Sequence, residues 1–181
     1  MRTNTCTLGL PDLLPHDAEK VRIGNMLSRV TSRLIRFCRK RKCAVVLENP
    51  LTSWIWKQPH VAKQLGAALC TTVHFCQFGM PWRKATRFAS WHAGWLHALE
   101  RRCGRSDGFC SRNGLRHVVL EGVDGSGRRR TLLAEPYPRE LCTEFARLAT
   151  QHFDWCDRLG ASARSHEWSA VSGSVDCAEG V

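Results

Sequence analysis

The clearest pattern in the chain is an apolar residue at every third or fourth position across residues 17–40. The apolar members of this stripe are Ile23, Leu27, Val30, Leu34 and Phe37 or Cys38. Their spacing, close to the 3.6 residues of a helical turn, predicts an amphipathic helix with Asp17 as a plausible N-cap. The cations that lie off the stripe are Arg29, Arg33, Arg36, Arg39 and Lys40. Those in the C-terminal turn also suit the negative end of the helix dipole.

A different pattern follows this helix, because residues 43–47 are apolar without interruption. Such a run is typical of a strand that is buried on both faces in a parallel sheet. The other strands that we expect are residues 71–78, 86–91 and 115–120, with a return segment at 128–133 after the Asp124-Gly125-Ser126-Gly127 turn. The other helices that we expect are residues 61–69, 94–102 and 138–158.

This alternation of helices and strands predicts the α/β class. We expect a partial Rossmann-like, mostly parallel sheet with flanking helices and a C-terminal hairpin. Residues 1–16 form an irregular lead-in and residues 17–159 form the domain. Residues 160–181, which are rich in Ser, Ala and Gly, are expected to be a disordered tail.

Charge points to a partner class. The 181 residues include 27 Lys and Arg against 16 Asp and Glu, which gives a net charge of +11. A balance of this kind is typical of proteins that bind polyanions, so nucleic acid is the expected partner, and a solvated basic surface without a specific partner is the alternative. No apolar stretch approaches the ~20 residues of a membrane span, and the chain begins without an apolar leader, so we expect a nuclear or cytoplasmic protein that is neither secreted nor membrane-bound.

Three metal-ligating residues follow one another at equal intervals. Cys103, Cys110 and His117 are each seven residues apart in a loop-rich segment. With Cys76 or His97 they could complete a tetrahedral zinc site. The spacing matches none of the common tight zinc knuckles, so a structural zinc and unliganded loop thiols both remain open.

Two segments carry a family resemblance. The first is Val-Val-Leu-Glu-Asn-Pro at 45–50, and the second is Phe-Gly-Met-Pro-Trp-Arg-Lys-Ala-Thr-Arg-Phe at 78–88. Together they resemble cytosine-5 DNA methyltransferases, in which one strand ends in Glu-Asn-Val or Glu-Asn-Pro and a later turn reads Tyr-Gly-Val-Pro-Gln-x-Arg-x-Arg. The resemblance covers roughly residues 8–150 and is strongest to phage and mobile-element members.

The resemblance implies roles for individual residues. Glu48 would be the catalytic carboxylate that hydrogen-bonds the edge of a flipped cytosine, and Asn49 and Pro50 would shape the turn beneath it. In the second segment Trp82 replaces the family's Gln, and Lys84 replaces an Arg, so the bidentate geometry of Arg is lost there. The substrate-binding residues that the resemblance implies are Asn49, Pro50, Lys84, Thr86 and Arg87.

Two departures from the family decide the functional prediction. No proline is followed by cysteine, so the Pro-Cys nucleophile is missing, and no cofactor loop precedes Glu48. The chain therefore resembles the second half of a catalytic domain, truncated as in a mobile element. We expect this module to bind nucleic acid, DNA rather than RNA, and not to be catalytic alone. The alternatives are an S-adenosylmethionine-dependent methyltransferase half completed in trans by a partner chain, and a non-enzymatic basic nucleic-acid-binding fragment. Alone, the chain is expected to need no cofactor apart from a structural zinc.

Overall fold

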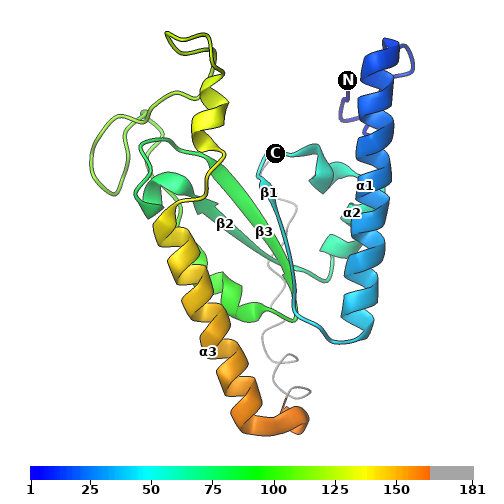
Figure 1. Cartoon of the computed structure of the whole chain (residues 1–181), viewed down its shortest axis with the longest axis vertical. Coiled ribbons are helices and arrows are strands. Elements are labelled where there is room, and N and C mark those ends of the chain that lie inside the picture. Colours follow the sequence, from blue (N-terminus) through cyan, green and yellow to red (C-terminus); the bar gives the residue numbers. More distant parts are fainter. Residues whose placement is uncertain (164–181) are drawn as a thin grey trace.

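The computed structural model describes the backbone of residues 1–163 and the side chains of residues 1–154. Two long helices lie on opposite sides of a small sheet (Figure 1). The helices are α1 (Pro15–Lys40), α2 (Pro59–Leu65) and α3 (Arg139–Ala163), and the strands are β1 (Val45–Pro50), β2 (Leu69–His74) and β3 (Ala85–Trp91). Short 3-10 turns join them: η1 (Trp54–Lys57), η2 (Phe75–Phe78), η3 (Gly94–Leu99) and η4 (Arg130–Ala134). Of the predicted tail, residues 160–163 continue α3, and the rest lies outside the described residues.

The sheet has three strands in the order β1-β3-β2, and β3 pairs antiparallel with both neighbours. The predicted parallel Rossmann-like sheet is therefore wrong. Residues 45–50 and 69–74 do run in the same direction, but β3 returns between them and takes the hydrogen bonds of both. A short apolar run looks the same in either kind of sheet once both faces are covered, so the pattern could not reveal the strand directions.

Both faces of the sheet are buried, each against different helices. On the first face, which we call the α1 face, Ile35 of α1 and Trp56 of η1 pack against Ala89 and Trp91 of β3. On the opposite α3 face, Leu141 of α3 packs with the residues Val73, Phe75, Phe78, Phe88, Leu96 and Leu99. Side chains alternate between the two faces along each strand. Neighbouring residues in a strand therefore enter different layers.

The C-terminal third differs most from the prediction. Residues 115–120 form no strand; Leu115 is 67% exposed, and only a single bridge joins Phe109 to Arg116. The turn at Asp124 is present, since the N–H of Gly127 donates to the carbonyl of Asp124 at 3.0 Å. The predicted hairpin shrinks to one bridge between Val123 and Arg129, because the chain then coils into η4. Among the described residues, no helix is long and apolar enough to cross a membrane.

Candidate metal centre

Four metal-ligating side chains converge beside the C-terminal end of β2. The sulfur atoms of Cys76, Cys103 and Cys110 and a ring nitrogen of His117 all lie within 4.8 Å of one another. Cys103 Sγ is 3.8 Å from His117 Nε2. Ligands at zinc bond lengths in a tetrahedron lie about 3.6 to 3.8 Å apart, so Cys103 and His117 already have the separation of two ligands of one ion, and the longest separations in the cluster would have to shorten. Within the described residues, the structure thus brings the three evenly spaced ligands together.

The fourth member of the cluster is Cys76, and not the alternative His97. Cys76 lies in η2, which Gly79 ends with a positive φ of 88°. The other ligands come from the loop that follows η3. There the N–H of Cys110 donates to the carbonyl of Leu115 at 2.7 Å, and this turn places Cys110 and His117 on the same side. His97 instead faces Glu100, with its Nδ1 3.4 Å from the carboxylate.

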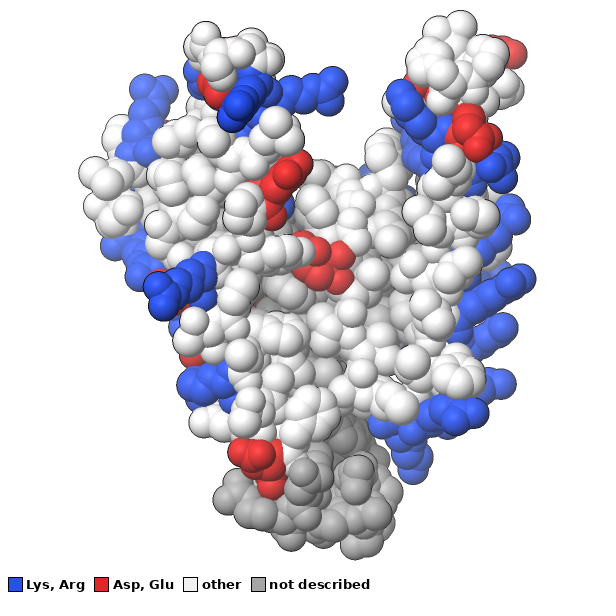
Figure 2. Space-filling model, in the orientation of Figure 1, with Lys and Arg blue, Asp and Glu red and all other residues white. Residues whose placement is uncertain are grey.

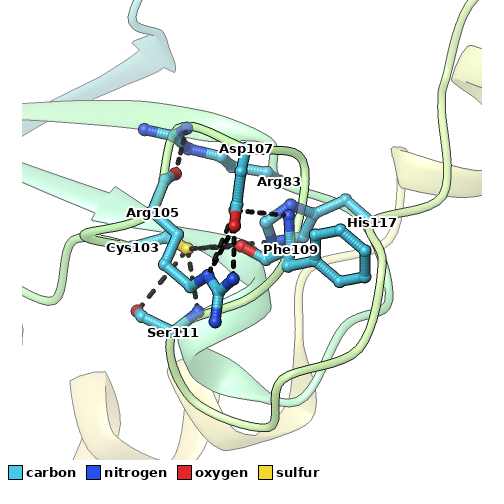
Figure 3. A network of polar contacts seen from close by, with 7 residues as sticks. All are labelled: Arg83, Cys103, Arg105, Asp107, Phe109, Ser111 and His117. Carbon is cyan, nitrogen blue, oxygen red and sulfur yellow. Dashed lines mark hydrogen bonds and ion pairs between the residues drawn. The ribbon is translucent and has the colours of Figure 1, made fainter.

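Hydrogen-bond donors surround the three sulfurs. The N–H and the hydroxyl of Ser111 lie 3.3 and 3.5 Å from Cys103 Sγ (Figure 3). The amide nitrogen of Gln77 lies 3.6 Å from the sulfurs of both Cys76 and Cys110. Donors of this kind favour thiolates, which are the form that binds a metal. Sequence reasoning missed Gln77 and Ser111, although each follows a ligand directly in the chain.

The pKa values of two thiols in the cluster shift in opposite directions. Burial raises the pKa of Cys76, and its two neighbouring thiols raise it further. Burial also opposes ionisation of Cys103, but the hydrogen bonds from Ser111, together with those from the Arg105 backbone and Cys76, lower the pKa of Cys103. A divalent cation would reverse the penalty on Cys76, because coordination deprotonates a thiol outright. Three thiolates and one imidazole are a donor set that suits zinc.

The cluster is fastened to both the sheet and α3. The ring nitrogen Nδ1 of His74 accepts from the N–H of Cys103 at 2.8 Å and from Arg83 at 3.3 Å. Burial and the nearby charge of Arg83 lower the pKa of His74 to about 4, so its ring is neutral and able to accept. On the other side, Arg112 donates to the carboxylate of Glu140 in the first turn of α3 at 3.0 Å. The loop therefore bridges β2 and α3.

The proposed base pocket around Glu48 is only partly assembled. The Tyr137 hydroxyl, just before α3, donates to the Glu48 carboxylate. The Lys84 ammonium lies 5.8 Å from the Tyr137 ring centre and donates to the Ala134 carbonyl at 2.8 Å. Burial raises the pKa of Tyr137, and the Glu48 carboxylate adds to this shift. Glu48 and Lys84 thus meet through Tyr137, a residue that the sequence prediction did not include.

The remaining pocket residues divide between the two faces of the sheet. Arg87 pairs across the sheet with Asn49, so the two share the α1 face, where the Arg87 guanidinium lies 5.5 Å from the Trp56 ring centre. Pro50 pairs with Thr86 on the α3 face, which is the face of Glu48, and Thr86 is fully buried. Because adjacent strand residues point to opposite faces, the sheet itself separates Glu48 from Asn49 and Arg87.

The largest uninterrupted run of positive charge lies on α1 and just beyond it. Nine Lys and Arg residues occur between positions 20 and 42, and no Asp or Glu occurs from 20 to 47. Four of them form an exposed row along one side of the helix: Arg29, Arg33, Arg36 and Lys40. Figure 2 shows Lys and Arg side chains projecting along the outer edge of α1. We call these four residues the cationic row.

The members of the cationic row form no ion pair with any residue that the structure describes. The cations that do pair with carboxylates lie mostly elsewhere, as Arg105 does with Asp107 and Arg147 with Glu144. Arg22, near the start of α1, pairs with Glu19. Positive charge is therefore least compensated toward the C-terminal half of α1.

Comparisons with known proteins add no assignment: no protein family model matches the chain, and neither a curated protein nor a solved structure is significantly similar to it.

Proposed function

We propose that the chain is a zinc-stabilised, non-catalytic module that binds nucleic acid through the cationic row of α1. The main support for this proposal is the cationic row itself. Its four cations are exposed, lie on one side of one helix and have no carboxylate partner among the described residues. They extend over twelve residues, a rise of about 16 Å along the helix, which is long enough to lie beside several successive phosphates.

The surroundings of Glu48 favour a function that does not involve catalysis. Its carboxylate accepts the hydroxyl of Tyr137, so an incoming base would have to displace that bond. Asn49 and Arg87 lie on the far side of the sheet. Binding that depends on phosphates rather than on a base pocket needs neither group. Of the three functional alternatives, the basic nucleic-acid-binding module therefore fits the geometry best.

Binding to single-stranded and double-stranded DNA and RNA across a salt series tests this proposal. We expect affinity to fall steeply as the salt concentration rises. On duplex DNA, the slope of log affinity against log salt concentration should steepen by about 0.9 for each phosphate contact. Neutralising Arg29, Arg33 and Arg36 to Gln should weaken binding and reduce the slope by roughly 2 to 3. The matched control neutralises Arg102, Arg105 and Arg147, which are ion-paired and which change the net charge equally.

The control separates a local site from net charge. Equal losses in the two triple variants would mean that only total charge matters, and the proposed row would be wrong. Glu48→Gln should leave affinity and slope unchanged. Transfer of a labelled methyl group from S-adenosylmethionine by the chain alone, abolished by Glu48→Gln, would overturn the non-catalytic reading.

The zinc proposal rests on the Cys76, Cys103, Cys110 and His117 cluster and has its own test. Protein prepared with zinc should carry about one ion per chain, and cobalt in its place should give the visible absorption of a tetrahedral sulfur-rich site. Cys103→Ser should release the metal, whereas Cys142→Ser, which changes an exposed thiol outside the cluster, should retain it. Full occupancy in Cys103→Ser would rule out the proposed site.

A further inference from the structure

The apolar stripe of α1 faces away from the protein core. Its five residues, which are between 40 and 59% exposed, are Ile23, Leu27, Val30, Leu34 and Phe37. The residues that α1 buries instead are Val21, Ser28 and Ile35, which lie on another side of the helix. Large apolar side chains in a continuous row on a surface commonly mark an interaction site.

The spacing of the stripe narrows the kind of partner. Its residues follow one another at intervals of four, three, four and three. This is the repeat with which one helix packs its side chains between those of a second helix in a coiled coil. A second helix could therefore lie along α1 for about four turns, with each of the five side chains entering a gap between its residues.

The two borders of the stripe differ in charge. One border is formed by Met26, Arg33 and Lys40, which recur every seven residues. The other is formed by Gly24, Thr31 and Cys38, which are uncharged and half-buried. In a helix pair, border residues of one helix face border residues of the other, so a complementary partner has Glu or Asp beside its own apolar seam.

We propose that the α1 stripe binds an acidic amphipathic helix of another protein. Its apolar seam would cover Leu27, Val30 and Leu34, and its carboxylates would face Arg33 and Lys40. This site adjoins the proposed nucleic-acid surface, because Arg33 and Lys40 belong to both. The helix proposal does not depend on nucleic-acid binding.

Charge disfavours a second copy of the chain as the occupant. Each α1 would bring its own uncompensated cations, and neither border of the stripe offers a carboxylate to receive them. An antiparallel pair would place cationic borders opposite each other, which is destabilising. An anionic membrane is a different class of partner, but it would not require the four-three spacing.

The probe for this proposal is a synthetic peptide of three heptads with Leu at both seam positions and Glu at both borders. Its binding to the full chain is measured by fluorescence anisotropy at physiological salt. Two control peptides are used, one with Lys in place of Glu and one with the acidic composition scrambled. Leu34→Gln should weaken binding of the acidic peptide about tenfold or more, whereas Leu132→Gln, at an exposed site in η4, should not.

A charge-reversed variant keeps the test decisive if Leu34→Gln alters the fold. Arg33→Glu combined with Lys40→Glu should exchange the preference, so that the Lys peptide binds better than the Glu peptide. Equal binding of the scrambled peptide would overturn the proposal, because charge alone would then explain it. Sedimentation of the chain as a dimer that Leu34→Gln dissociates would assign the stripe to a second copy. Binding to anionic vesicles that Leu34→Gln abolishes would assign it to a membrane.

Discussion

Helices α1 and α3 are of similar length, 26 and 25 residues, and both are amphipathic, yet they use their apolar sides in opposite ways. In α3, Leu141 is 2% exposed, and Phe145 and Leu148 pack against the same core. The ring of Phe145 meets the edge of Trp95 at 5.3 Å between centres. In α1, the apolar stripe is exposed, and the helix packs instead through Val21, Ser28 and Ile35.

This contrast teaches that an apolar period predicts a helix but not which surface covers it. The period identifies a side of the helix that is unfavourable to expose. Whether this chain or another molecule covers that side depends on where the remaining elements pack. In α3 the sheet supplies the cover, and in α1 the described residues leave the stripe free for a partner. The two helices should therefore respond differently to the same substitutions.

The largest contrast is expected for leucine truncation. Leu141→Ala should lower the free energy of unfolding by about 2 to 5 kcal/mol, because it leaves a cavity in the core. Leu34→Ala should change it by no more than about 0.5 kcal/mol in the isolated chain. Chemical denaturation of the two variants measures both values. A loss above about 1 kcal/mol for Leu34→Ala would show that its side chain is already covered in solution.

Metal removal should also affect the two helices differently, because it should destabilise the region around α3 more than α1. Arg112 joins the loop that carries Cys103, Cys110 and His117 to Glu140 in the first turn of α3, whereas none of the four candidate ligands lies in α1. With free zinc at 100 times its dissociation constant, chelation should cost about 2.7 kcal/mol of stability. Hydrogen exchange should then rise most in residues 103–117 and at the start of α3. A uniform rise that included α1 equally would contradict a local role for the metal.

A smaller and better matched contrast lies within α1 itself. Ile35 is 2% exposed and Ile23 is 40% exposed, so the same Ile→Val change can be made on both sides of one helix. Ile35→Val should cost about 0.5 to 1.5 kcal/mol, and Ile23→Val less than about 0.5 kcal/mol. Thermal and urea unfolding measure the pair. Equal costs would mean that α1 is rotated about its axis in solution.

The smallest expected effects differ in sign. Arg33 lies four residues after Arg29 and three before Arg36, so Arg33→Gln should stabilise the chain by about 0.2 to 0.5 kcal/mol at low salt. Arg147 in α3 bonds the carboxylate of Glu144 at 2.9 Å, so Arg147→Gln should cost a similar amount. Both effects should shrink at high salt, because salt screens exposed charges. If Arg33→Gln destabilised the chain as Arg147→Gln does, a carboxylate would have to compensate the charge of the cationic row.

The candidate sites show how far sequence reasoning could reach. Equal spacing identified Cys103, Cys110 and His117, because side chains in one short loop can meet without knowledge of the rest of the fold. Cys76 and His97 could be distinguished only once η2 and η3 were placed. The arrangement of the residues predicted around Glu48 could not be read from the two motifs, because it depends on how β1 and β3 pair. Alternation along β1 and β3 puts Asn49 and Arg87 on the face opposite Glu48.

The sequence by itself determined the local features: the two amphipathic helices, the apolar strand after α1, the turn at Asp124 and the accumulation of cations between residues 20 and 42. Each depends on residues that are near one another in the chain, so period, turn propensity and charge reveal it. Tertiary structure alone decided the antiparallel order, the fourth metal ligand, the contact of Tyr137 with Glu48 and the exposure of the α1 stripe. These features join segments far apart in the chain, and the free energy of packing, which selects among such pairings, is a property of the whole fold.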